Sequence, residues 1–307
     1  MKDLVYAADL GGTNLRMATV DSAGNIRHLT KKPVPHGVSP DQLMALIGDM
    51  ANECRGPMSP EADLNAVAFT APSPVARDFD GVLTKLPNLP SITGMNLKVE
   101  LHKLFGLPVF IENDATAAGI GENWIGATKG VANAVCVTLG TGVGGGIIIN
   151  GEPLRGKDGT GGEIGHICVE PDGHPCGCGS HGCVEQYASA TALARMAREA
   201  GLSFSTAADV YAVWQAGDQH AADVFNIMGR HLGIMLAGLM NAMNPEMIVI
   251  CGGVTNGWDA FIQPLTDEVF ARAYEVAATR AKIVRGTLGD NAGILGAARS
   301  AFLSFGS

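Results

Sequence analysis

The sequence predicts an α/β protein built from two similar domains around a hinged cleft. Each half of the chain opens with two apolar strands joined by a glycine-rich turn, "DLGGTNLR" in the first half and "LGTGVGGG" in the second. Each half then continues into further strands and helices. We expect a small N-terminal domain of residues 1–115 plus about 291–307, and a larger C-terminal domain of residues 116–290. A site is expected in the cleft between them.

The composition limits the class of protein. The chain has 307 residues, of which 47% are hydrophobic and 17% charged, enough for two cores and unlike a disordered chain. A net charge of −9 disfavours nucleic acid and anionic membranes as main partners. The start of the chain shows no export signal, and no apolar run is long enough to cross a membrane. We therefore expect a cytoplasmic protein whose cysteines stay reduced.

Apolar spacing and turn residues predict the elements in order. Strands are expected over 5–10, 15–20 and 109–112, and a third of the first series after the turn "DSAGN". "AVAFTAPSPV" is expected to be a strand running into a Pro-rich loop, "AVCVTLGTGVGGGIIIN" two strands joined by a glycine-rich turn, and "MIVICGG" a further strand. Helices are expected over 40–54, 97–105, 115–124, 186–200, 207–216, 221–243, 261–275 and 293–302.

The glycine turns have two interpretations. Gly140, Gly142 and Gly145 fit the spacing G-x-G-x-x-G, but a strand follows them where a dinucleotide-binding motif needs a helix. Either turn alone is most simply a tight hairpin. Two such turns at equivalent places favour a clamp for a polyphosphate, because glycine lets backbone N–H groups converge on an anion. No Walker motif G-x-x-x-x-G-K-[ST] is present in the sequence.

This pattern resembles the superfamily of sugar kinases, Hsp70 and actin, whose domains are ribonuclease-H-like and whose two turns grip ATP. The stretch "CGGV" after a strand looks like the loop on the adenosine side in that superfamily. The resemblance implies a nucleotide site made by Asp9, Gly11, Gly12, Thr13, Asn14, Arg16, Thr141, Gly142, Gly252 and Gly253, with Asp9 holding hydrated Mg²⁺.

An acid lies where a buried strand meets a helix. In "VFIENDATAAGIGE", Asp114 falls near the start of the predicted helix, where it is either a plain helix cap or a general base acting on an alcohol. The helix N-terminus would keep the carboxylate ionised. Phosphoryl transfer needs alignment, charge neutralisation and one acceptor for the hydroxyl proton, so two phosphate turns favour the base.

Three cysteines gather in "GHPCGCGSHGCVEQ". Cys176, Cys178 and Cys183, with His166 ten residues before the first, would complete a closed tetrahedral zinc site. A closed site implies a structural metal. Free thiols and a disulfide are the alternatives, the disulfide disfavoured by the expected compartment, and His174 and His181 are rival ligands. The other cysteines, Cys54, Cys136, Cys168 and Cys251, lie mostly in apolar runs and are expected in the core.

Two acids flank the cysteine loop. Glu163 lies three residues before His166, and Glu185 lies two residues after Cys183. As a pair they suit glycoside hydrolysis, hydrogen bonding to sugar hydroxyls, or no more than solvated surface positions.

The chain resembles ROK-family sugar kinases over nearly its whole length. The matching stretches are "DLGGTNLR", "PNL", "ENDATAA", "LGTGVGGG", "GGEIGH", "CGCGSHGCVE" and "LGDNAGILGAA". The resemblance implies that ATP with Mg²⁺ phosphorylates the 6-hydroxyl of a hexose, expected to be glucose, with Asp114 as the base. It implies a homodimer, and sugar contacts by Asn88, Asn113, Glu163, His166 and Glu185. His166 would place one ring nitrogen on zinc and the other on the sugar.

One departure concerns the sugar. The family often has Gly-x-Pro-Gly before a Val, where this chain has "TAPSPV" with Ser73 in place of a glycine. The alternatives are an N-acetylhexosamine kinase for N-acetylglucosamine or N-acetylmannosamine, a fructokinase, a sugar-binding module, and a repressor. Repressors of the family carry an added N-terminal helix-turn-helix, for which the first predicted strand leaves no room.

Overall fold

A computed structural model describes residues 4–56, 64–72, 81–84, 86, 89–204 and 206–305 of the chain. The chain divides into two compact units. The first contains Met1–Lys129, Pro153–Gly161 and Asp290–Ser307, and the second contains Gly130–Glu152 and Gly162–Gly289. Each unit is built around one five-stranded sheet.

The sheet of the first unit has the strand order β3-β2-β1-β4-β5. Strand β1 pairs antiparallel with β2 and parallel with β4, and β4 pairs parallel with β5. The hairpin β1–β2 carries the turn "GGT" of the predicted phosphate site. The strands are β1 (Leu4–Leu10), β2 (Asn14–Asp21), β3 (Ile26–Pro33), β4 (Leu64–Ala71) and β5 (Val109–Asn113).

The second sheet repeats this plan, with the order β10-β9-β6-β7-β8. Strand β6 pairs antiparallel with β7 and parallel with β9, and β9 pairs parallel with β10, so β6 corresponds to β1 and β7 to β2. The prediction of two similar ribonuclease-H-like units is thereby confirmed. The strands are β6 (Ala134–Leu139), β7 (Val143–Ile149), β8 (Glu152–Pro153), β9 (Met247–Cys251) and β10 (Lys282–Arg285).

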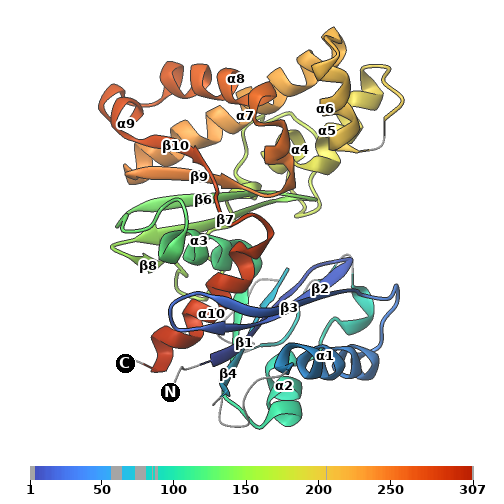
Figure 1. The fold of residues 1–307 in the computed structure, drawn as a ribbon. Coiled ribbons are helices and arrows are strands. Elements are labelled where there is room, and N and C mark those ends of the chain that lie inside the picture. Colours follow the sequence, from blue (N-terminus) through green and yellow to red (C-terminus); the bar gives the residue numbers. More distant parts are fainter. Residues whose placement is uncertain are drawn as a thin grey trace. The chain divides into compact units, whose positions relative to one another are not determined.

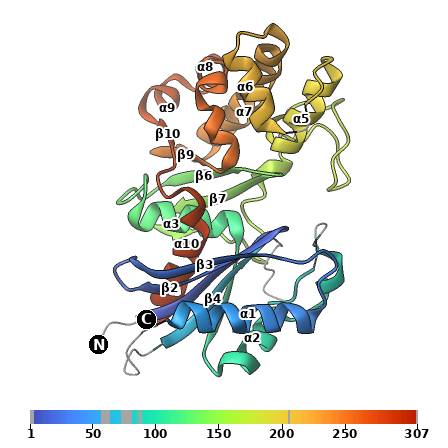
Figure 2. The same cartoon turned by 45° about the vertical axis from the view of Figure 1, so that its right-hand side comes forward.

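Helices cover both faces of the first sheet. Figures 1 and 2 show α1 and α2 on one face and α10 on the other. The core lies between the sheet and α1–α2 and includes Phe69, Leu43 and Leu101, all fully buried. The helices of this unit are α1 (Pro40–Arg55), α2 (Leu97–Phe105), α3 (Asp114–Ile125) and α10 (Ala292–Phe305).

Glycines let α3 and α10 pack with their backbones in contact. A Cβ on Gly121 would lie 2.4 Å from the carbonyl oxygen of Ala292, and a Cβ on Gly296 would lie 1.7 Å from that of Ala117. Because a larger residue would collide with the facing backbone at such distances, the packing requires glycine at both positions. This packing brings the end of the chain back to the first unit and holds the start of α3 in place.

The second unit carries most of the helices. Its core joins the sheet to α7 and α8 through Phe225, Phe261 and Ile250, all essentially buried. The helices are α4 (Glu185–Ala188), α5 (Ala190–Glu199), α6 (Ala207–Gln215), α7 (Gln219–Met243), α8 (Trp258–Arg272) and α9 (Glu275–Arg280).

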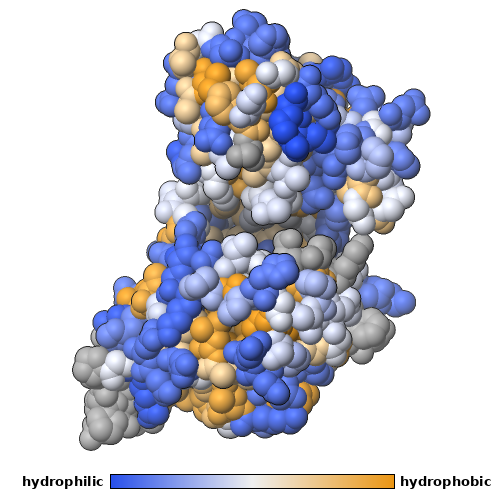
Figure 3. Space-filling view, turned by 90° about the vertical axis from the view of Figure 1, so that its right-hand side faces the viewer, coloured by the Kyte–Doolittle hydropathy of each residue, from blue (hydrophilic) through white to orange (hydrophobic). Residues whose placement is uncertain are grey.

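The surface is mixed in character. The face drawn in Figure 3 is largely hydrophilic, with apolar residues gathered over part of each unit. Among the described residues, the exposed large hydrophobic side chains include Phe270, Tyr274 and Val276, at the end of α8 and the start of α9. No helix in the described part of the chain has the length and apolar character to cross a membrane.

Three elements differ from the sequence-based prediction. The helix expected over 186–200 is two helices, because Ser189 is extended and caps α5 by accepting from the N–H of Ala192. The helix expected over 261–275 begins earlier and ends at Arg272, and α9 follows separately. Strand β10 was not predicted, because its four residues are too few to show a pattern.

The division into compact units differs from the domain boundaries expected above. It groups residues 116–129 and 153–161 with the first unit, since α3 packs on α10. The boundaries 1–115 with about 291–307, and 116–290, stay a prediction about the domains.

Replacing Gly296 by alanine tests the packing of α3 on α10. The added Cβ must push the two helix backbones apart, so Gly296→Ala should lower the free energy of unfolding by at least about 2 kcal/mol. Gly238→Ala is the control: it lies within α7 with nothing within 4 Å of its Cβ position, and should stabilise by about 0.5–1 kcal/mol. Thermal unfolding of both variants measures the difference, and equal effects would contradict this account of the glycine.

Candidate functional site

In the first unit, parallel strands bring polar side chains to one edge of the sheet. The register pairs Asp9 of β1 with Thr70 of β4, and Thr70 and Ala71 with Glu112 and Asn113 of β5. The hydroxyl of Thr70 donates to Asp9 Oδ1 at 2.5 Å. Parallel strands end at the same edge, where ligands of open α/β sheets bind.

The carboxylate of Asp9 lies partly buried beside the start of α10. A Cβ on Gly293 would lie 3.5 Å from Asp9 Cγ, so the first turn of that helix packs directly on the acid. Burial raises the pKa of Asp9, and the hydrogen bond from Thr70 and the charge of Arg16 act in the opposite direction. A poorly solvated carboxylate gains from a nearby cation, which suits this residue to hold hydrated Mg²⁺.

Backbone hydrogen bonds hold the β1–β2 turn in place, and part of the turn is exposed to solvent. The N–H of Gly11 donates to the carbonyl of Asn14, and the N–H of Val34 donates to the carbonyl of Thr13, both at 2.9 Å. The amide of Asn14 donates to the Thr13 hydroxyl at 3.0 Å, and Thr13 is exposed. Gly12 lies between them, half-buried, so the predicted residues 11–14 form one small exposed surface.

Arg16 reaches the segment that enters α10. Its guanidinium donates to the carbonyl oxygen of Asp290 and, at 2.9 Å, to Oδ1 of Asn291. The side chain predicted to contact nucleotide therefore ties β2 to the start of α10. The motif "LGDN" was noted in the sequence without a role, and Thr70 had no signal, because its place beside Asp9 depends on strand register.

Asn113 and Asp114 have different places at the start of α3. Asn113 is the N-cap, and its Oδ1 accepts from the N–H groups of Ala115 and Thr116 at 3.1 and 3.0 Å. Asp114 is the first helical residue and is half-buried. Asn113 therefore supplies the helix cap. Asp114 Oδ1 accepts from the N–H of Ala115 at 2.8 Å, and the carboxylate lies at the helix N-terminus, where negative charge is stabilised.

An ion pair holds the end of β5, directly before the start of α3. Glu112, buried at the end of β5, accepts from Arg155 at 2.5 Å. Arg155 belongs to the segment Pro153–Gly161, which returns to the first unit. Sequence reasoning missed this pair, because the two residues are far apart in the chain and neither lies in a recognisable motif.

In the second unit, the two predicted nucleotide turns are neighbours. Gly252 has a φ of 92°, and a Cβ on it would lie 2.3 Å from the carbonyl oxygen of Leu139, the residue that leads into the Gly140–Gly142 turn. The next residue, Gly253, has open space around its Cβ position. Thr141 is exposed, and its carbonyl accepts from the hydroxyl of Thr191 at 2.8 Å.

Glu185 lies against the Gly140–Gly142 turn. Its Oε2 accepts from the N–H of Val143 at 3.1 Å, and a Cβ on Gly142 would lie 2.4 Å from the same oxygen. Glu163, the other acid predicted to contact sugar, is exposed beside the short helical turn that leads to His166. Glu185 is thus no solvated surface acid.

The four predicted metal ligands meet. The ligand atoms of His166, Cys176, Cys178 and Cys183 all lie within 4.8 Å of one another. Nδ1 of the histidine is 3.6 Å from Cys176 Sγ, and the sulfurs of Cys178 and Cys183 are 3.6 Å apart. Three thiols and one imidazole at such separations fit a tetrahedral zinc ion with Zn–S bonds of about 2.3 Å.

The thiols of this group differ in their acidity. Hydrogen bonding from the backbone of Ser180 lowers the pKa of Cys178, while burial raises the pKa of Cys183 to about 12. Nδ1 of the rival ligand His174 faces the carbonyl oxygen of Pro175 at 2.9 Å, and neither His174 nor His181 belongs to the group.

The remaining cysteines correct one expectation. Cys54, Cys136 and Cys251 are buried as predicted, but Cys168 is exposed. Its backbone forms an isolated bridge with Cys183, and its own side chain lies at the surface although the next residue, Val169, packs against the core.

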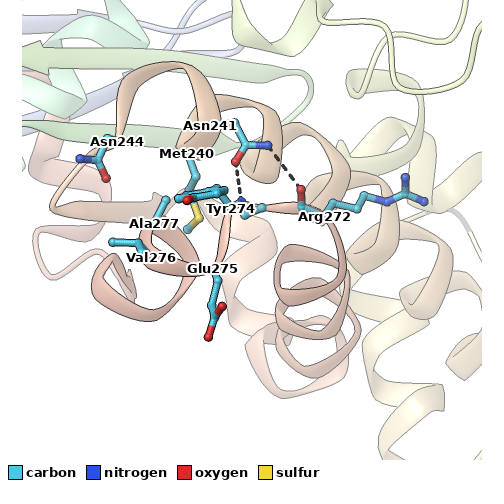
Figure 4. A pocket seen from close by; sticks show the side chains of 9 residues that line it. Met240, Asn241, Asn244, Arg272, Tyr274, Glu275, Val276 and Ala277 are labelled. Atoms are coloured by element: carbon cyan, nitrogen blue, oxygen red, sulfur yellow. Dashed lines mark hydrogen bonds between the residues drawn. The ribbon is translucent and has the colours of Figure 1, made fainter.

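Some residues lie outside this description. Asn88 and Ser73 fall outside the described residues, so their predicted roles stay predictions. A surface cavity of about 810 Å³ between α7 and α9 is shown in Figure 4, lined by Met240, Asn241, Arg272 and Tyr274 among others. It contains none of the predicted site residues that the structure describes, so it is not the candidate site.

The repeated sheet and its turns define a class. Two ribonuclease-H-like units, each with a glycine turn between its first two strands, are the architecture of the sugar kinase, Hsp70 and actin superfamily. Within that class the chain belongs to the ROK family, whose model matches residues 5–302.

Similar proteins span almost the whole chain. A glucokinase of Halalkalibacterium halodurans is 37% identical, over 96% of this chain and 94% of its own length. The ROK hexokinase of Thermus thermophilus is 31% identical with a TM-score of 0.85, covering 100% of this chain and 99% of the other. A ROK glucokinase of Streptomyces griseus, in complex with glucose and AMPPNP, is 31% identical with a TM-score of 0.83, covering 97% and 98%.

The raised pKa of Asp9 predicts that the ionised carboxylate, which suits Mg²⁺ binding, lowers the free energy of unfolding at neutral pH. The folded protein holds the Asp9 proton more tightly than the unfolded chain does, so ionised Asp9 costs stability above its raised pKa. Asp9→Asn, which keeps an acceptor for Thr70, should therefore raise the melting temperature at pH 7. The gain should shrink as the pH falls toward 3.8, the usual value for this group.

Thermal unfolding across this pH range, in the absence of nucleotide and Mg²⁺, measures the effect. Asp49→Asn, at an exposed position in the middle of α1, serves as the matched control. A loss of stability at pH 7 in Asp9→Asn would contradict the burial argument.

Proposed function

We propose that this protein is an ATP-dependent hexose kinase that phosphorylates the 6-hydroxyl of glucose. The observation that carries the proposal is the start of α3, which places the carboxylate of Asp114 directly after β5, at the end of the sheet where ligands of α/β folds bind. Support comes from the relatives named glucokinase, and from the S. griseus relative that holds glucose and AMPPNP.

Asp114 is the proposed general base. It accepts the proton of the 6-hydroxyl as the sugar oxygen forms its bond to the γ-phosphorus and the bond from phosphorus to the bridging oxygen of ADP breaks. The first turn of α3 stabilises the ionised carboxylate beforehand. The Glu112–Arg155 pair, which fixes the strand end just before it, limits the freedom of the base.

The nucleotide is held by the two glycine turns. Backbone N–H groups of residues 12–13 and 141–142, with the side chains of Thr13, Asn14 and Thr141, bind phosphate oxygens. Gly252 allows the loop to pack against the backbone of Leu139, and Gly253, with open space at its Cβ position, leaves room for the adenosine. Asp9 would hold hydrated Mg²⁺, which supplies charge neutralisation between the phosphates when bound.

The sugar is bound by the polar residues named from the family resemblance. These are Asn88, Asn113, Glu163, His166 and Glu185. The cap geometry engages Oδ1 of Asn113 with backbone N–H groups, so its side-chain nitrogen is the atom that donates to a sugar hydroxyl. In His166, Nδ1 faces the thiols, so Nε2 is the atom that faces the sugar.

Zinc is the proposed structural metal of the loop, with His166, Cys176, Cys178 and Cys183 as its ligands. Zinc would fix the tautomer of the imidazole and the path of the loop, and the closed ligand set leaves no position for a reacting group. Metal analysis of the purified protein should find about one zinc per chain, and about none in a Cys178→Ser, Cys183→Ser variant. A metal-free wild-type preparation that is folded and active would contradict the assignment.

Release of ADP in a coupled assay tests the reaction and the sugar together. Glucose should give the highest kcat/KM among glucose, fructose, mannose, N-acetylglucosamine and N-acetylmannosamine. Asp114→Asn should lower kcat by at least about 100-fold with a much smaller change in glucose affinity, because the base acts in the transition state. Asp158→Asn, at an exposed position in the same unit, should leave kcat unchanged.

Near-normal kcat in Asp114→Asn would show that Asp114 is not the general base. A preference for an N-acetylated sugar would keep the kinase and change its substrate, and no activity on any of the five sugars would favour a sugar-binding module.

We further propose a cytoplasmic homodimer that acts on small molecules, with neither nucleic acid nor membrane as a partner. The family resemblance and the exposed Phe270, Tyr274 and Val276 support the dimer, and the net charge of −9 disfavours nucleic acid. Sedimentation equilibrium measures the assembly directly.

A further inference from the structure

The residue that follows the second glycine turn is held from both sides. Val143 is the first residue of β7, and its N–H donates to Oε2 of Glu185 at 3.1 Å. Its carbonyl oxygen faces Gly165, where an added Cβ would lie 1.9 Å from that oxygen. The peptide groups on both sides of Val143 are therefore fixed by residues outside the hairpin.

Both contacts come from the ends of the cysteine loop. Gly165 directly precedes the ligand His166, and Glu185 follows the ligand Cys183 by two residues. The two ends are joined to each other by the N–H of Val184, which donates to the carbonyl of Ile167 at 3.0 Å. Whatever holds the four ligand side chains together also holds this pair of contacts on Val143.

The contact with Glu185 reaches the turn itself. A Cβ on Gly142 would lie 2.4 Å from Oε2 of Glu185, so the carboxylate packs against the backbone of the turn as well as bonding to the next residue. A hydrogen bond to an ionised carboxylate is stronger than a neutral one and has a defined direction. The path of residues 140–142 therefore depends on where this carboxylate lies.

We propose that Glu185 is a positioning residue for the nucleotide, through which the cysteine loop sets the geometry of the Gly140–Gly142 turn. This inference rests on the proposed function, in which that turn binds phosphate. It gives Glu185 a second duty beside its expected sugar contact: Oε2 holds the turn, and Oε1 remains for a hydroxyl. One carboxylate then serves the nucleotide and the sugar within the same unit.

Binding of AMPPNP with Mg²⁺, measured by calorimetry in the absence of sugar, separates this role from a sugar contact. Glu185→Ala should raise the dissociation constant of AMPPNP about tenfold, the effect of losing one hydrogen bond to a charged group. A residue that touches only sugar would leave this constant unchanged. Glu152→Ala, the same change of charge at an exposed residue of this unit, is the control and should have no effect.

Two further variants distinguish position from charge. Glu185→Gln keeps the length of the side chain and an oxygen that accepts from Val143, so it should bind AMPPNP nearly as tightly as wild type. Glu185→Asp keeps the charge but withdraws the oxygen from Val143, so it should bind as weakly as Glu185→Ala. The zinc content of each variant reports whether the loop is intact.

A contact between Glu185 and the turn also predicts coupling with Gly142. Gly142→Ala should weaken AMPPNP binding in wild type and cost less in the Glu185→Ala background, where space is available for the added methyl. Additive effects would contradict the contact.

The outcomes separate the inference from the function beneath it. The positioning role is overturned if Glu185→Ala binds AMPPNP as tightly as wild type. It is also overturned if Glu185→Asp binds as tightly as wild type while Glu185→Gln binds as weakly as Glu185→Ala. The proposed kinase activity would stand in both cases. Wild-type protein that neither binds AMPPNP nor releases ADP overturns the proposed function, and the inference with it.

Discussion

The meeting of His166 with three thiols is the constraint on which the site of the second unit depends. The chain between β8 and α4 contains little regular helix or strand, and its backbone hydrogen bonds are those of turns and isolated bridges. Ordering such a segment costs conformational entropy, and the proposed zinc ion, bound by four side chains, would offset that cost. It would also fix the places of Gly165, His166 and Glu185, so that a loop without a chemical step of its own sets the geometry of the groups around it.

The repetition of one sheet plan explains why the chemistry is divided. Each unit presents a glycine turn between its first two strands, and each turn is fastened by a different means. In the first unit, Val34 and Asn14 hold the turn through backbone hydrogen bonds. In the second, Glu185 and the neighbouring Gly252 hold it. The first unit adds the acids Asp9 and Asp114, and the second adds the cysteine loop.

Sequence reasoning reached what lies close together in the chain. The turns, the cysteine spacing and the acid at the start of α3 are each contained in a short stretch, and their local chemistry was readable there. Thr70 beside Asp9 follows only from the register of two parallel strands, and Glu185 on Val143 joins residues far apart in the chain. The break at Ser189 also escaped prediction, since apolar spacing continues through it, and Cys168 showed that apolar neighbours do not ensure burial.

The central claim is that this protein moves the γ-phosphoryl group of ATP to the 6-oxygen of glucose. Phosphorus NMR of a mixture of protein, glucose, ATP and Mg²⁺ follows that group directly. Transfer to the 6-oxygen should give loss of the γ-phosphate signal with growth of a phosphomonoester signal coupled to the two protons on carbon 6. A γ-phosphate that persists, or that appears as inorganic phosphate or on another oxygen of the sugar, would contradict it.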